Sequence, residues 1–109
     1  MKAASTLYRL LGDEARLRLL RVLARDHFNV KELTGILGLA QSGVSRHLGL
    51  LKDAGLVTEE RDGAFTYYRL SPTLRLDAGP LWPLLQTQFD DAAGSTLLKA
   101  DEARLQEVV

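Results

Sequence analysis

A mainly α-helical domain with one small β-hairpin is the fold class that the sequence predicts, and three observations predict it. Residues 29–37 have the apolar spacing of a short helix, and Gly38 begins a tight turn. Residues 41–54 have the spacing of a second helix. Residues 56–70 alternate as two strands do, on either side of Asp62-Gly63. Helix, turn, helix and hairpin in this order predict a winged helix-turn-helix, whose second helix can enter a major groove of DNA.

Length and composition are those of one small globular domain. The chain has 109 residues, of which 46% are hydrophobic and 26% are charged. It contains no cysteine, which excludes disulfides and thiolate metal ligands. No secretory signal or membrane-spanning stretch is visible, so we expect a cytoplasmic protein with no membrane partner.

The net charge of zero is distributed unevenly along the chain. Residues 1–76 hold 12 Lys/Arg against 8 Asp/Glu, whereas residues 77–109 hold 2 against 6. The basic excess therefore coincides with the predicted DNA-binding part, which is consistent with a nucleic-acid partner. We expect residues 1–76 to form the winged helix-turn-helix domain and residues 77–109 to form a dimerisation helix followed by a tail or linker.

Two helices are predicted before the helix-turn-helix. Residues 5–11 carry leucines at helical spacing, and Asp13 is a suitable N-cap for a helix over residues 14–24. We interpret the arginines of this second helix as a solvated basic face, with phosphate contact from some of them as the alternative; they are Arg16, Arg18, Arg21 and Arg25.

Short signals delimit the elements that follow. Residues 27–28 are interpreted as a possible edge strand. Asn29 and Glu32 have the spacing of a capping box, and Gly38 is predicted to end that helix as a C-cap. In the last third, prolines and glycines precede an apolar stripe over residues 81–89, and a polar helix is predicted over residues 100–109.

The predicted recognition helix has one apolar and one polar side. On a helical wheel Val44, Leu48 and Leu51 lie together, and small polar residues with Arg46 lie opposite them. Small residues permit close approach to DNA, and Arg46 is the best candidate for a guanine or a phosphate. A solvated face of an ordinary surface helix is the alternative, and His47 is interpreted as a packing residue.

The hairpin is the predicted wing. Strands are expected over residues 56–61 and 64–70, with a type I′ turn at Asp62-Gly63. The aromatic residues Phe65, Tyr67 and Tyr68 are interpreted as sheet packing rather than base stacking. The candidate DNA-binding residues of helix and wing are Gln41, Ser42, Gly43, Ser45, Arg46, Lys52, Arg61 and Arg69.

Four segments resemble the ArsR (ArsR/SmtB) family of bacterial transcriptional regulators. These segments are Leu11–Leu20, Gln41–Leu48, Ala54–Val57 and Tyr67–Leu70. The resemblance implies a homodimeric winged-helix repressor that binds an operator with dyad symmetry. It also implies dimerisation through the first and last helices, for which the candidates are Leu7, Leu10, Leu11, Leu81, Trp82, Leu85 and Phe89.

The chain departs from that family at its metal sites and in its recognition helix. Asn29 and Lys31 stand where arsenic- and lead-type sensors have thiolates, and neither histidine lies near the C-terminal helix. Asp90, Asp91 and Glu102 are interpreted as a solvated face, so no metal or other cofactor is expected, and the effector is not identified. Ala40 replaces a common Ser N-cap and Gly49 a frequent Lys, which predicts a less stable recognition helix that becomes ordered on DNA.

Two alternatives to a free-standing regulator stay open. Residues 97–109 resemble the connector in fusions of ArsR-type domains to S-adenosylmethionine-dependent methyltransferases, so the chain could be the N-terminal module of such a fusion. A winged helix used only for protein contact is the other alternative. No catalytic constellation is visible, and we expect no enzymatic activity.

Overall fold

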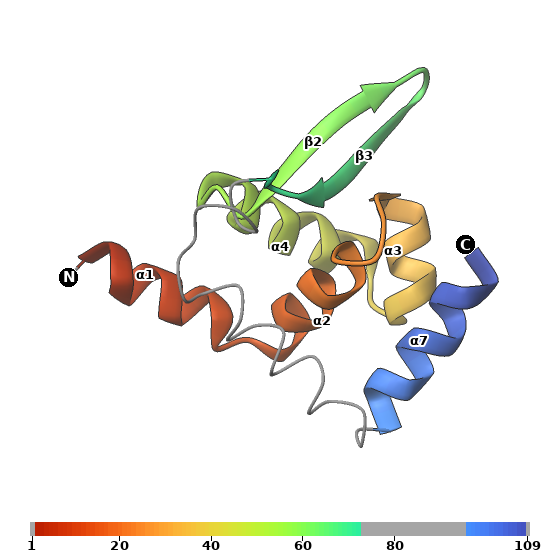
Figure 1. Cartoon of the computed structure of the whole chain (residues 1–109), viewed down its shortest axis with the longest axis horizontal. Coiled ribbons are helices and arrows are strands. Elements are labelled where there is room, and N and C mark those ends of the chain that lie inside the picture. The colour runs from red at the N-terminus through yellow and green to blue at the C-terminus, as the bar shows by residue number, and fades with distance from the viewer. Residues whose placement is uncertain (1, 73–95, 109) are drawn as a thin grey trace.

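Five helices and three short strands make up the parts of the chain that the structure describes. The computed structural model describes residues 2–72 and 96–108 (Figure 1). The elements, in chain order, are α1 (Lys2–Leu11), α2 (Glu14–Leu23), β1 (Phe28–Asn29), α3 (Val30–Leu37), α4 (Gln41–Asp53), β2 (Val57–Asp62), β3 (Phe65–Leu70) and α7 (Thr96–Val108).

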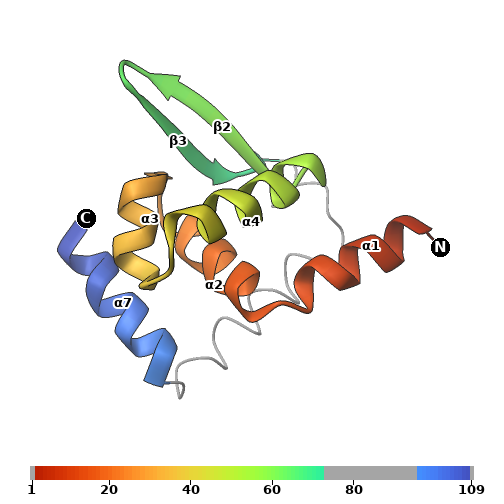
Figure 2. The same ribbon diagram turned by 180° about the vertical axis from the view of Figure 1, so that it is seen from behind.

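The core lies between α2, α3 and α4, with the base of the hairpin over one side and α7 over the other. Its fully buried side chains are almost all leucine, isoleucine or valine, and they come from every one of these elements. The hairpin projects from this body, and α1 extends away from it on the side opposite α7 (Figures 1 and 2). The predicted fold class is confirmed. None of the helices in the described ranges is long and apolar enough to cross a membrane.

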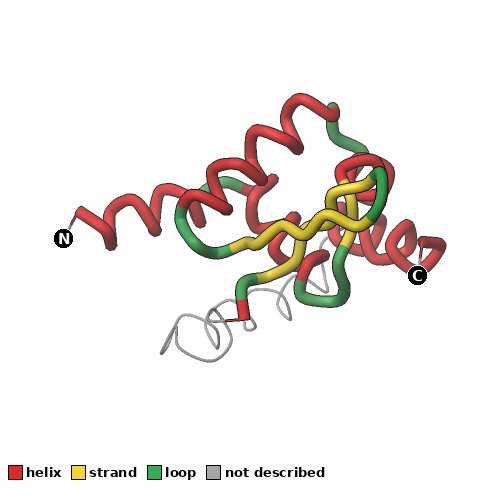
Figure 3. The backbone as a smooth tube through the Cα atoms, turned by 90° about the horizontal axis from the view of Figure 1, so that it is seen from above, coloured by secondary structure: helices red, strands yellow, loops and turns green. Residues whose placement is uncertain are grey.

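The three strands form one antiparallel sheet in the order β1-β3-β2. Phe28 pairs with Tyr68 and Asn29 with Tyr67, so an edge strand does form, one residue later than the predicted residues 27–28. Seen from above, the strands cross the middle of the molecule, with α1 extending on one side and α7 on the other (Figure 3). Because Phe28 and Leu70 are buried, the sheet is anchored to the core at its base.

The turn of the hairpin lies one residue later than the sequence predicts. Asp62 pairs with Phe65, so the two loop residues are Gly63 and Ala64. Gly63 has φ of 63°, and no described residue other than glycine has a positive φ. A type I′ turn requires positive φ at both central positions, so the predicted type I′ turn at Asp62-Gly63 is wrong. Glycine at the first loop position is typical of a type II′ turn.

The predicted helix caps are confirmed. The Asp13 side chain accepts a hydrogen bond from the Arg16 amide and starts α2. Asn29 and Glu32 form the reciprocal capping box at the start of α3, with N···O distances of 2.8 and 3.0 Å. Gly38 ends α3 in the left-handed conformation, with φ of 66°, which glycine adopts without strain.

The C-terminal helix α7 is more than the polar helix that the sequence predicts. It begins at Thr96 rather than residue 100, and it packs against α2 and α3. Leu105 is 1% exposed and Asp101 is fully buried. The apolar stripe over residues 81–89 and the domain boundary after residue 76 lie outside the described residues. The connector to a methyltransferase stays a prediction.

The interpretation of the α2 arginines as a solvated basic face is wrong for Arg18, which is buried, and for Arg16 and Arg21, which are half-buried, whereas Arg25 is exposed. Arg18 is 7% exposed and forms a two-point ion pair with Asp101. Arg21 and Arg25 both pair with Glu102, at 3.3 and 2.5 Å, so Glu102 is not merely a solvated side chain either.

Arg16 belongs to the same set of paired arginines. Its guanidinium donates to the carbonyls of Leu10 and Arg9 at the end of α1. The arginines of α2 therefore serve to join α2 to α1, α3 and α7.

Candidate nucleic-acid interface

The first turn and a half of α4 presents a polar, exposed surface. Gln41, Ser42, Ser45 and Arg46 are exposed, and Gly43 is half-buried. On the other side of the helix the residues predicted to be apolar packing residues are buried; they are Val44, Leu48 and Leu51. The core thus holds α4 in the orientation that the helical wheel predicts, with its small and polar side chains facing outward.

The backbone at the start of α4 is available to an anion. Ala40 occupies the N-cap position and makes no side-chain hydrogen bond to the helix. The first amide groups of an α-helix have no acceptor within the helix, and a phosphate oxygen can accept from them. The missing cap therefore lowers the stability of the free helix and leaves these donors to a ligand.

Arg46 is the principal cation of this surface. Its side chain is exposed and makes no ion pair or hydrogen bond with the described part of the chain. Lys52, near the opposite end of α4, pairs with Glu59 of β2 at 2.5 Å. That hydrogen bond raises the pKa of Lys52 and lowers the pKa of Glu59, so both groups stay charged at neutral pH.

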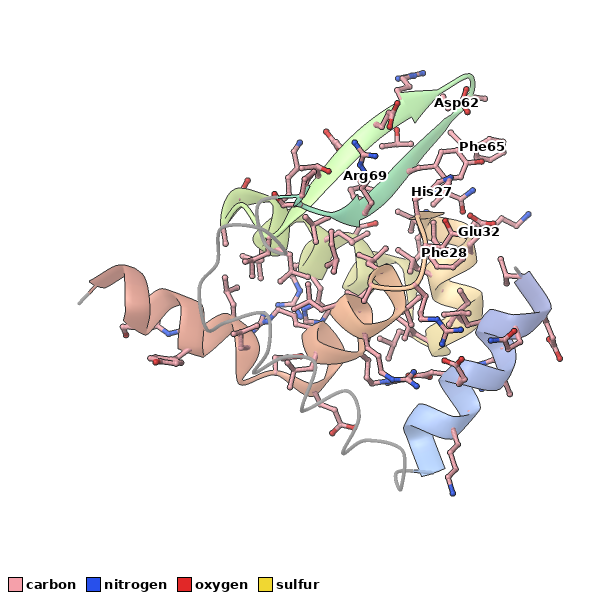
Figure 4. The ribbon with its side chains drawn as sticks, in the orientation of Figure 1. His27, Phe28, Glu32, Asp62, Phe65 and Arg69 are labelled. Carbon is pink, nitrogen blue, oxygen red and sulfur yellow. The ribbon has the colours of Figure 1, made fainter. Side chains whose placement is uncertain are left out.

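The structure brings Arg61 and Arg69 to opposite faces of the wing. Side chains alternate along a strand, and Glu59 contacts α4 through Lys52, so Arg61 lies on the same face as α4. Arg69 pairs across the sheet with Thr58 and belongs to the outer face, as Figure 4 shows. Of the two wing arginines, only Arg61 shares a side with Arg46.

The aromatic residues Phe65, Tyr67 and Tyr68 pack along the wing, as the sequence predicts. Phe65 is 52% exposed, whereas Tyr68 on the inner face packs against the core. Tyr67 lies between the rings of Phe65 and His27, with centroid distances of 6.4 and 5.3 Å. A hollow of about 120 Å³ lies on this face, lined by His27, Glu60, Tyr67 and Arg69. Because side chains alternate along a strand, the sequence pattern on either side of the turn already places Glu60, Tyr67 and Arg69 on one face of the hairpin.

His47 is a packing residue, as the sequence predicts. It is 7% exposed, and its Nδ1 atom has no hydrogen-bond partner among the residues that the structure describes. Burial lowers its pKa, Asp13 opposes this effect, and the charges of Arg16 and Arg46 add to it. The folded state therefore favours the neutral imidazole.

Stability is expected to decrease as the pH falls below about 6.5, the ordinary pKa of histidine in an unfolded chain. Because the pKa of His47 is lower in the folded state, the unfolded state binds the proton first, with a limiting slope of about 1.4 kcal/mol per pH unit. Urea unfolding at pH 7.5, 6.5 and 5.5 measures this decrease. The variant His47→Leu should flatten it and the exposed control His27→Gln should not; the same slope in both variants would contradict the assignment.

Gly49 lies on the exposed side of α4 and is a source of instability. A Cβ atom added there would meet nothing within 4 Å. Gly49→Ala is therefore expected to raise the free energy of unfolding by about 1 kcal/mol, because glycine has the greater backbone entropy in the unfolded chain. Thermal unfolding followed by circular dichroism checks this. Gly38→Ala is the matched control and should destabilise, since φ at Gly38 is positive.

Asn29 and Lys31, which stand where related metal sensors have thiolates, have other roles in this chain. The side-chain oxygen of Asn29 accepts a hydrogen bond from the Glu32 backbone amide in the capping box, and Lys31 is exposed at the start of α3. Within residues 2–72 and 96–108, no group of three or more His, Cys, Asp or Glu side chains is placed to hold a metal ion.

Comparisons with known proteins agree with this geometry. Residues 13–59 match the model of the bacterial regulatory protein arsR family. The chain is 34% identical over 102 residues to the arsenic resistance transcriptional regulator ArsR1 of Pseudomonas putida, which covers 93% of this chain and 76% of that protein. It is 35% identical over 77 residues to the arsenical resistance operon repressor of Escherichia coli, covering 70% of this chain and 62% of the relative.

A solved structure shares the fold. It is the homodimeric winged helix-turn-helix DNA-binding domain of a possible ArsR-family regulator from Mycobacterium bovis, with a TM-score of 0.69 and 27% identity over 84% of this chain and 82% of that one. The fold and the exposed start of α4 define a winged helix-turn-helix transcriptional regulator. The chain belongs to the arsR family of bacterial regulatory proteins.

Proposed function

We propose that this chain is a transcriptional repressor that binds, as a homodimer, a DNA operator with dyad symmetry. The observation that carries the proposal is the start of α4, where Ser42, Ser45 and Arg46 are exposed beside helix amides without an N-cap side chain. Such a surface can approach base edges and phosphates in a major groove. The Escherichia coli relative is named an operon repressor, which supports repression rather than activation as the role of this chain.

Helix α1 is the part of the proposed dimer contact that the structure describes. Tyr8 is 69% exposed there, the most exposed of the large hydrophobic side chains in the described part of the chain. Leu10 is already buried and Leu11 packs against the core of the same chain, so both support α1 from within. We therefore add Tyr8 to the predicted contacts. The Mycobacterium bovis domain is described as homodimeric, which supports this assembly.

The proposed repressor does not use the thiolate metal sites of its family. Asn29 and Lys31 supply no thiolate, and the amide oxygen of Asn29 is engaged in the capping box. The signal that releases the protein from DNA is therefore expected to act elsewhere.

Binding to DNA fragments tests the proposal directly. Duplexes enriched by the full chain from a randomised pool are expected to contain two inverted half-sites, with centres about 10 base pairs or a multiple apart. Fluorescence anisotropy between 50 and 200 mM salt should show affinity that falls steeply, because phosphate contacts release counterions. A scrambled duplex of equal length is the control. Equal affinity for both duplexes, or a single half-site bound by a monomer, would contradict the proposal.

A further inference from the structure

We propose that Asp101, on the C-terminal helix α7, is a positioning residue for DNA recognition. Through Arg18 and Arg104 it holds the end of α3, and the end of α3 sets the turn that leads into α4. This inference rests on the proposed function, since it concerns how the DNA-contacting helix is kept in place. It assigns α7 a role in affinity for DNA in addition to its role in the core.

Asp101 is the centre of a buried charge cluster. Its carboxylate is fully buried and accepts two hydrogen bonds of 2.8 Å from Arg18, one from Nε and one from Nη2. Nη2 of Arg104 donates to the same carboxylate at 3.1 Å. The hydrogen bond with Asp101 raises the pKa of Arg18, which is a cation at every accessible pH. One carboxylate therefore orients two guanidinium groups.

Both guanidinium groups reach the same end of α3. Arg18 Nη2 donates to the Leu37 carbonyl at 2.6 Å, and Arg104 Nε donates to the Ile36 carbonyl at 2.5 Å. The last carbonyls of an α-helix have no N–H donor within the helix, and cations are favourable at that end. The two arginines act as side-chain caps on the C-terminus of α3, and Asp101 aims them.

The capped end of α3 lies directly before the recognition helix. Only Gly38, Leu39 and Ala40 separate the two helices. Leu37 is 2% exposed, and a Cβ on Gly38 would lie 3.8 Å from Arg104. Ala40 supplies no side-chain cap, so no capping hydrogen bond fixes the first turn of α4 if this connection loosens. The position of the first turn of α4 thus depends on how firmly the end of α3 is held.

Apolar packing also anchors α7, and it provides the control because it supplies none of the hydrogen bonds to the last carbonyls of α3. Leu105 is 1% exposed and lies in the apolar core cluster, so its side chain anchors α7 by packing alone. A purely structural role for α7 predicts that loss of Leu105 and loss of Asp101 have the same kind of consequence, namely fewer folded molecules. A positioning role predicts that only loss of Asp101 changes the affinity of the molecules that remain folded.

The test compares Asp101→Asn with Leu105→Ala in the full chain. The probe is the duplex that the wild-type chain enriches from a randomised pool. Stoichiometric titration gives the active fraction, and anisotropy gives the Kd of that fraction. For Asp101→Asn we expect a Kd about tenfold higher, as when the competent arrangement is populated about a tenth of the time. For Leu105→Ala we expect a lower active fraction with an unchanged Kd.

A second variant keeps the proposal testable if Asp101→Asn does not fold. Arg18→Met combined with Asp101→Leu replaces the buried charge pair by apolar side chains, a change that often preserves stability. It also removes one carbonyl cap and the group that aims the other, so its Kd should still rise about tenfold. Hydrogen exchange of the amides of residues 39–43 should accelerate in this variant and not in Leu105→Ala.

The outcomes separate the two proposals. If the wild-type chain shows no preference for any duplex, the proposed function fails and this inference fails with it. If the wild-type chain binds and the Asp101 variants bind with the same Kd, the positioning role alone is overturned. An equal rise in Kd for Leu105→Ala would likewise overturn it, because the effect would then belong to the core as a whole.

Discussion

Asparagine in place of Asp101 is expected to lower the free energy of unfolding by about 3–5 kcal/mol, the cost of removing one partner from a buried ion pair. The variant leaves the Arg18 cation 7% exposed and without its carboxylate. The amide cannot supply the two charged acceptors that the guanidinium now uses. Because small domains are stable by only about 5–15 kcal/mol, this change is large. Urea unfolding followed by circular dichroism at pH 7.5 measures it.

Glu102→Gln is the matched control for this prediction. Glu102 is one residue along the same helix and pairs with Arg21 and Arg25, but these side chains are partly exposed. Pairs of that kind contribute about 0–1 kcal/mol. Nearby cations and hydrogen bonds lower the pKa of Glu102 against the opposing effect of its burial, so its share of stability is lost only in acid, as the pH falls below about 4. Equal losses in the two variants at pH 7.5 would contradict the special role of the buried pair.

Replacing Arg46 by Ala is expected to weaken specific DNA binding by about 1–3 kcal/mol, or tenfold to more than a hundredfold, if its guanidinium contacts a guanine. The side chain is exposed and has no partner in the described part of the chain, so the fold should not depend on it. The melting temperature of Arg46→Ala is therefore expected to match that of the wild type. Anisotropy with the enriched duplex and with its scrambled control measures the loss in each.

Whether Arg46 contacts a base or a phosphate determines how the loss of affinity compares between the enriched and the scrambled duplex. A base contact weakens binding to the enriched duplex more than to the scrambled one, whereas a phosphate contact weakens both alike and reduces the salt dependence by about one counterion. Arg69→Ala is the control within the wing, because Arg69 lies on the face away from α4. Wild-type affinity in Arg46→Ala would remove Arg46 from the interface. A larger loss in Arg69→Ala would move the interface to the outer face of the wing.

The sequence could predict those features that depend on neighbouring residues. Helix caps are such features: a side chain reaches an amide three residues away, so Asp13 and the Asn29–Glu32 pair were recognisable from spacing alone. The exposed face of α4 was predictable for the same reason, since the periodicity of a helix sets which residues share a side. These local rules were sufficient to predict the fold class and to nominate Arg46.

The hairpin shows where local rules become insufficient. The Asp62-Gly63 pair correctly predicted a turn but placed it one residue too early. The register of the sheet puts the two loop residues at Gly63 and Ala64. Period-two alternation already puts Arg61 and Arg69 on opposite faces, whereas the assembled sheet decided which face the core covers and left Phe65 exposed. Register depends on which side chains the core can accept, and that is a property of the assembled sheet rather than of the turn.

By itself, then, the sequence determined the order of the elements, their caps and the polar start of α4, because all of these arise from contacts within a few residues. Only the tertiary structure decided what the arginines of α2 do. Arg18 and Asp101 are 83 positions apart in the sequence, and the residues next to either one give no sign that the two form an ion pair. A charged residue in a helix is read as solvated until a partner from a distant segment is brought to it, since burial is favourable only once the opposite charge and the carbonyls of α3 are in place.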